Sequence, residues 1–223
     1  QIADVGNGNY SYIDSVSEAR KVLVDELSST FNTVAKDVKV QIEFNPNWVS
    51  EYRLIGYENR QLNREDFNND KVDAGDVGAG KSVTAIYEIT PQGAASSVDP
   101  LRYQNEKQAS ASKVVPEFAF LKIRYKQPSA TTSTLLTQPL MLPKSITPFT
   151  SATNDHRFAT AVAGFGQLLR QSSNMGNLSY GQVLQIAQQA KGTDKMGTRA
   201  EFIQLVQNVQ ALTQKTDLHA QAE

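Results

Sequence analysis

The fold depends on residues 66–91, which read Asp66-Phe-Asn-Asn-Asp-Lys-Val-Asp-Ala-Gly-Asp-Val-Gly-Ala-Gly-Lys-Ser-Val-Thr-Ala-Ile-Tyr-Glu-Ile-Thr-Pro91. An acidic, Asn-rich loop leads into a Gly-rich turn, and the turn leads into a run of alternating residues over 82–90. Every second residue of that run is apolar or aromatic: Val83, Ala85, Tyr87 and Ile89. This period of two indicates a β-strand. We therefore expect a long glycine turn that delivers the chain into a central strand.

The glycine turn also matches the phosphate-binding pattern G-x-x-x-x-G-K-[ST], with Gly75, Gly80, Lys81 and Ser82 at its fixed positions. Such a loop binds phosphate only when a strand precedes it and a helix follows, because the helix N-terminus supplies the amides that hold the phosphates. Here turn residues precede the pattern and a strand follows it. The pattern is therefore interpreted as a decoy, and we expect no nucleotide cofactor.

The acidic part of the stretch is a candidate calcium site. Its oxygen donors alternate as in an EF-hand loop, and the full set is Asp66, Asn68, Asp70, Asp73 and Asp76. Two fixed EF-hand positions fail, since the sixth is Lys71 instead of Gly and the twelfth is Val77 instead of Glu. Two alternatives stay open: a solvated turn and a calcium-binding loop of another kind.

Composition excludes several classes of function. The 223 residues carry a formal net charge of −1 and no stripe of basic residues, so we expect no nucleic-acid partner. No apolar run approaches the roughly 18 residues that a membrane span needs. The chain has no Cys, and its two histidines are His156 and His219. Without a nucleophile motif or paired carboxylates in an apolar setting, we expect a protein that is not an enzyme.

The middle of the chain predicts an antiparallel β domain over residues 36–150. Alternating or apolar-rich segments predict strands over 38–44, 48–57, 82–90, 117–126 and 135–142. Pro139 places the last of these at the edge of a sheet, because proline cannot donate a ladder hydrogen bond. Strands joined by long connections favour a β-sandwich or half-sandwich.

Helical patterns flank this domain. A short strand over 6–13 precedes a helix that begins at the capping box Ser15–Glu18, and we expect the apolar stripe of that helix to be buried. Three more helices are expected in residues 151–223, behind caps at Asn154-Asp155, Ser179–Gln182 and Thr198–Glu201, with a frayed tail from Gln214. The predicted class is α+β, with the three C-terminal helices forming a bundle packed on the β domain.

Several long motifs carry a family resemblance. They include Gly6-Asn-Gly-Asn-Tyr-Ser-Tyr-Ile-Asp14, Tyr52-Arg-Leu-Ile-Gly-Tyr-Glu-Asn-Arg60 and Phe158-Ala-Thr-Ala-Val-Ala-Gly-Phe-Gly166. Together they make nearly the whole chain resemble the C-terminal portion of bacterial von Willebrand factor type A (VWA) domain proteins, of the group described as calcium-activated chloride channel homologues.

The resemblance implies two parts. Residues 1–35 would be the last strand and helix of the VWA domain, and residues 36–223 would be the conserved C-terminal region that follows it. Within that region the residue patterns predict a sandwich-like domain over 36–150 and a helical subdomain over 151–223. The metal site of such proteins lies upstream, and no residue here matches it. Relatives of this kind are exported or lipid-anchored, so the resemblance implies the bacterial cell envelope, with a periplasmic or lipid-anchored location.

The functional expectation combines the absence of catalytic motifs with this resemblance. We expect a non-enzymatic protein–protein interaction or scaffolding region that accompanies a VWA domain, with that upstream domain and other proteins as partners. The alternative is a calcium-binding adhesion or regulatory domain that uses the loop 66–76.

Overall fold

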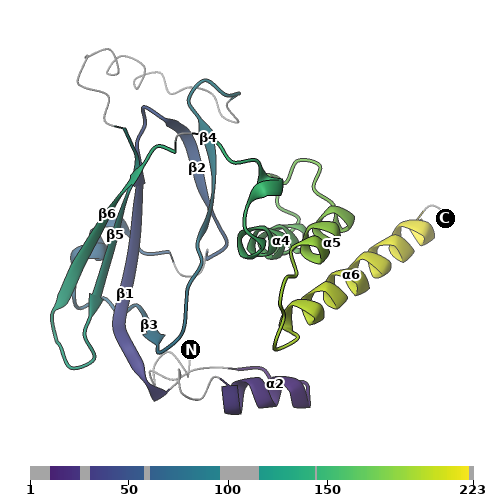
Figure 1. Ribbon diagram of the computed structural model, residues 1–223, viewed down its shortest axis with the longest axis horizontal. Coiled ribbons are helices and arrows are strands. Elements are labelled where there is room, and N and C mark those ends of the chain that lie inside the picture. The colour runs from purple at the N-terminus through teal and green to yellow at the C-terminus, as the bar shows by residue number, and fades with distance from the viewer. Residues whose placement is uncertain (1–10, 26–30, 58–60, 96–115, 144, 221–223) are drawn as a thin grey trace. The chain divides into compact units, whose positions relative to one another are not determined.

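The computed structural model describes residues 11–25, 31–57, 61–95, 116–143 and 145–220 (Figure 1). Within these residues the fold mixes two antiparallel sheets with four α-helices, which confirms the expected combination of antiparallel strands and helices. Two compact units form. The first contains Gln1–Ser50, Arg60–Val83 and Thr90–Leu142, and the second contains Glu51–Asn59, Thr84–Ile89 and Pro143–Glu223. The domain boundaries expected at 35/36 and 150/151 stay predictions.

The first unit contains a four-stranded sheet with the order β3-β1-β5-β6 (Figure 1). The strands are β1 (Thr33–Phe44), β3 (Gly75–Gly78), β5 (Glu117–Lys126) and β6 (Ser133–Met141). All three pairings are antiparallel. β5 has the predicted bounds of 117–126, and β6 lies at the edge of the sheet, where Pro139 placed it.

Two expectations about the stretch 66–91 are wrong. Gly75–Gly78 is a strand instead of a turn, because its backbone pairs with β1 from Thr33↔Gly78 to Val38↔Gly75. The following strand, β4 (Ile86–Pro91), begins later than residue 82. The turn is confined to Ala79-Gly80, where Gly80 adopts a φ of +75° and Lys81 N–H donates to the Gly78 carbonyl at 3.1 Å.

The N-terminal part contains α2 (Val16–Arg20), which continues as the π-helix η1 (Lys21–Asp25). The Glu18 N–H donates to the Ser15 hydroxyl oxygen at 3.1 Å, which is one half of the predicted capping box. Most of the strand expected over 6–13 lies outside the described residues, and residues 11–13 are not in a strand. Each helix among the described residues is too short or too polar to span a membrane.

The second unit contains most of a two-stranded sheet and three helices. β2 (Val49–Ile55) pairs with β4, and the helices are α4 (Asn154–Leu169), α5 (Tyr180–Gln189) and α6 (Thr198–Ala220). One-turn 3₁₀ helices lie at η3 (Arg64–Asn68), in the first unit, and at η4 (Phe149–Ser151), in the second. The Arg53 side chain of β2 joins the sheet to the helices, because its guanidinium donates to Gln167 at 3.3 Å and to the Asn174 carbonyl at 3.3 Å.

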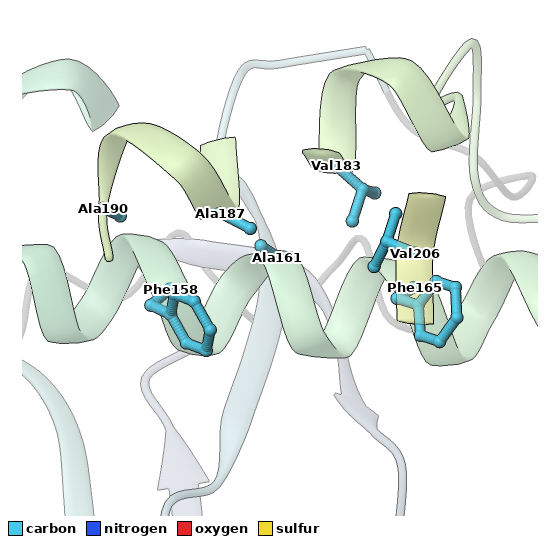
Figure 2. Close-up of a cluster of buried hydrophobic side chains, with 7 residues drawn as sticks. All are labelled: Phe158, Ala161, Phe165, Val183, Ala187, Ala190 and Val206. Carbon is cyan, nitrogen blue, oxygen red and sulfur yellow. The ribbon is translucent and has the colours of Figure 1, made fainter. Parts of the chain in front are cut away.

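The three helices share one hydrophobic core. Figure 2 shows its buried side chains, which come from all three helices and from the C-cap of α5, Ala190: Phe158, Ala161, Phe165, Val183, Ala187, Ala190 and Val206. Phe202 adds edge-to-face contacts with Phe158 and Phe165, at centroid distances of 5.4 and 5.5 Å. The apolar stripes predicted for these helices therefore meet, while the finer layering into a bundle and a sandwich stays a prediction.

Of the caps predicted for the three C-terminal helices, one is confirmed. The capping box of Ser179 and Gln182 at α5 is confirmed, with both hydrogen bonds present. At α4 the cap is Thr153, whose hydroxyl accepts from the His156 N–H at 3.3 Å, instead of Asn154 or Asp155. At α6 the predicted box is wrong because Thr198 is itself helical, and the helix continues to Ala220 instead of fraying from Gln214.

Candidate functional site

The candidate residues of the acidic loop lie in the first unit, close to a group of charged side chains on the sheet. We call this group the Asp37 cluster and define it as Asp37, Lys39, Asp70, Asp73, Asp76, Arg124 and Lys126. Asp37 and Lys39 come from β1, and Arg124 and Lys126 come from β5, which is its neighbour in the sheet. The aspartates 70, 73 and 76 come from the segment between η3 and β3 and from β3 itself.

Asp37 lies at a bulge of β1. The pairing with β5 shifts register between Lys36 and Lys39, and Asp37 has a φ of +49°, a conformation that Asp tolerates better than most residues. Its carboxylate accepts from the Lys126 ammonium at 2.6 Å and from the Ala74 N–H at 3.2 Å. Its own N–H donates to the Asp76 carboxylate at 3.1 Å. Through these hydrogen bonds the bulge connects β5 with the end of the acidic loop.

Lys39 is buried, with 3% of its surface exposed. Its ammonium donates to the backbone carbonyl oxygens of Asn69 at 2.5 Å and Asp66 at 3.3 Å. A buried lysine is stable only when its charge is met by hydrogen-bond acceptors, and here the loop supplies them. The alternation of β1 predicts a solvated face that includes Lys39, and this prediction is wrong for Lys39 because the loop covers it.

Asp70 and Asn68 attach the loop to the other strands. The carboxylate of Asp70 accepts hydrogen bonds from both the hydroxyl and the N–H of Ser133, the latter at 3.1 Å. The Asp70 carbonyl accepts from Lys126 at 2.8 Å. Asn68 accepts from the Arg124 guanidinium at 3.0 Å. Side chains of β1, β5 and β6 thus hold the loop through its oxygen atoms.

The cluster shifts the acidities of its members. Burial raises the pKa of Asp37, but the hydrogen bonds from Lys126 and the Ala74 amide outweigh it and leave the pKa below its ordinary value. The hydrogen bonds from Ser133 lower the pKa of Asp70. Burial, followed by the hydrogen bond with Asp37, raises the pKa of Asp73. The hydrogen bond to Asp37 raises the pKa of Lys126, which keeps its charge.

These contacts bear on the calcium hypothesis. Among the described residues, no group of three or more His, Cys, Asp or Glu side chains is arranged to hold a metal ion. Of the five candidates, Asp66 accepts from the Asn63 side chain at 3.1 Å, and Asn68, Asp70 and Asp76 accept from protein donors as described above. The ammonium groups of Lys39 and Lys126 donate to backbone carbonyl oxygens of the same loop. Calcium binding stays a prediction, and the geometry offers it no assembled ligand set.

The P-loop pattern falls on a strand, a turn and an irregular segment. Gly75 begins β3, Gly80 lies in the turn, and Lys81 and Ser82 belong to the irregular segment before β4. No helix begins anywhere in residues 75–91, all of which the structure describes, so the amides of a helix N-terminus do not face this loop. The interpretation as a decoy stays a prediction, now with this geometry in its favour.

Sequence reasoning did not find the cationic half of the cluster. Lys39, Arg124 and Lys126 occur at ordinary positions of alternating strands, and their role depends on a loop at least 27 residues away in sequence. Asp37 could have been identified as a bulge position from the sequence. An aspartate among the β-branched residues of a strand is unfavourable and often marks a bulge.

Comparison with known proteins places the chain in a family. A family model described as "Uncharacterized protein YfbK, C-terminal" matches residues 29–212. Over 213 residues the chain is 52% identical to the protein named "Uncharacterized protein YfbK" of Escherichia coli (strain K12). The aligned region covers 96% of this chain and 36% of that curated relative. No solved structure matches the chain. The chain therefore belongs to the family of YfbK C-terminal regions.

Proposed function

We propose that this chain is a non-enzymatic protein–protein interaction or scaffolding region that accompanies a VWA domain in the bacterial cell envelope. Its partners would be that VWA domain and other envelope proteins. The proposal includes the layering inferred from the sequence, in which a β-sandwich-like domain and a three-helix bundle follow the last strand and helix of the VWA domain.

One observation carries the proposal: the apolar stripe after Ser15, predicted as Ala19, Val22, Leu23, Leu27, Phe31 and Val34, is exposed at Leu23 and Phe31, while Ala19 and Val22 are half-buried. Leu23 is 59% exposed and Phe31 is 81% exposed, although both belong to the stripe that the periodicity predicts to be buried. α2 and η1 contact each other and make at most marginal contacts with other elements of the described chain. Exposed apolar side chains on one segment mark a surface that another protein or domain covers.

The origin of this segment supports a VWA domain as the covering body. Residues 1–35 resemble the last strand and helix of such a domain, whose final helix packs its apolar stripe on the domain's own sheet. The chain also spans 36% of the length of its E. coli relative, so that relative contains further sequence that could supply the missing core.

The test is a binding experiment with the part of the E. coli relative that the chain does not match. The purified chain and that part are mixed and separated by size-exclusion chromatography, with calcium and then with a chelator. We expect one complex under both conditions. The double variant Leu23→Asp, Phe31→Asp should lose the complex, because two charges would enter the apolar contact.

Val83→Asp is the matched control, since Val83 is also exposed, at 69%, but lies outside the stripe. This variant should bind like the unchanged chain. The same three proteins then serve as bait for an E. coli envelope extract. The proposal fails if the unchanged chain forms no complex with the relative's remaining part and retains no envelope protein that the double variant loses. A catalytic turnover by the chain would contradict its non-enzymatic character.

A further inference from the structure

We draw no further inference here: the strongest candidate, the apolar surface patch of the four-stranded sheet where Val40, Ile123 and Leu136 stand in register on β1, β5 and β6, carries none because nothing in the structure shows what covers it.

Discussion

The buried ammonium of Lys39 is the residue-scale feature on which the acidic loop depends. It is the shared donor to the carbonyls of Asp66 and Asn69. Lys39→Met keeps the apolar stem but leaves both carbonyls without this partner, so we expect the free energy of unfolding to fall by about 1–3 kcal/mol. Urea unfolding followed by circular dichroism measures it.

Lys122→Met is the matched control for this prediction. Lys122 lies on β5, on the same face of the sheet as Lys39, and makes one long ion pair with Glu43 at 3.9 Å and a contact with the Phe120 ring at 5.7 Å. Its removal should change the free energy of unfolding by less than about 0.5 kcal/mol. Equal changes in the free energy of unfolding for the two substitutions would show that the contacts of Lys39 with the loop do not add to stability.

The pKa values of Asp37 and Asp73 are shifted in opposite directions, and this leads to a second prediction at the residue scale. The pKa of Asp37 is lowered, so its contribution to stability is present above its ordinary value of 3.8 and is lost as the pH falls below that value. The pKa of Asp73 is raised, chiefly by burial, so its ionisation opposes folding once the pH rises above 3.8. We expect Asp37→Asn to destabilise and Asp73→Asn to stabilise the chain at neutral pH.

Both effects should shrink as the pH is lowered through the acid range, because the carboxyl groups that the substitutions remove become protonated in the folded and unfolded states alike. Thermal melts at a series of pH values measure this. The assigned pKa directions would be wrong if Asp73→Asn lowered the melting temperature at neutral pH, or if the loss in Asp37→Asn were the same at acid pH.

At the scale of the elements, the start of α6 depends on a residue outside the helix. The Asp194 carboxylate accepts from the amides of Arg199 at 3.3 Å and Ala200 at 2.8 Å. Burial raises the pKa of Asp194, but these two amides outweigh it and lower the pKa below its ordinary value. The carboxylate therefore satisfies the first-turn donors of α6 and complements the positive end of its dipole.

Asp194→Ala should lower the free energy of unfolding of the chain by about 0.5–2 kcal/mol, the usual cost of removing an N-terminal cap. Thr198→Ala, at the cap position that the sequence pattern suggests, should cost less. Chemical denaturation of the two variants compares them directly. A larger loss for Thr198→Ala would favour the capping box over the Asp194 contacts.

At the scale of the whole molecule, the calcium hypothesis makes a prediction about stability. A ligand that binds the folded state alone raises the melting temperature. Because Asn68, Asp70 and Asp76 already accept from protein donors and two ammonium groups lie against the loop, we expect calcium to leave the melting temperature unchanged. Thermal melts with calcium and with a chelator measure this.

The double variant Asp70→Ala, Asp73→Ala is the control for that experiment. If calcium stabilised the unchanged chain and not this variant, the acidic loop would be a calcium site and the regulatory alternative would gain support. If calcium stabilised both equally, the ion would bind elsewhere.

Local patterns in the sequence determined most of the regular structure. The alternation over 117–126 and the capping box at Ser179 depend on residues within a few positions of one another, so they predicted β5 and the start of α5 correctly. Pro139 predicted an edge position for β6 for the same reason, since the missing N–H is a property of one residue. The candidate loop residues were also found locally, by their spacing.

Tertiary structure alone decided the strand at Gly75–Gly78 and the burial of Lys39. In both, the partner comes from a distant part of the chain: β1 for the glycines and the loop after η3 for the lysine. Intrinsic propensity disfavours glycine in strands and burial of lysine, and only hydrogen bonds from those distant partners outweigh it. The identity of such partners depends on which segments fold against one another, and a local pattern does not contain that information.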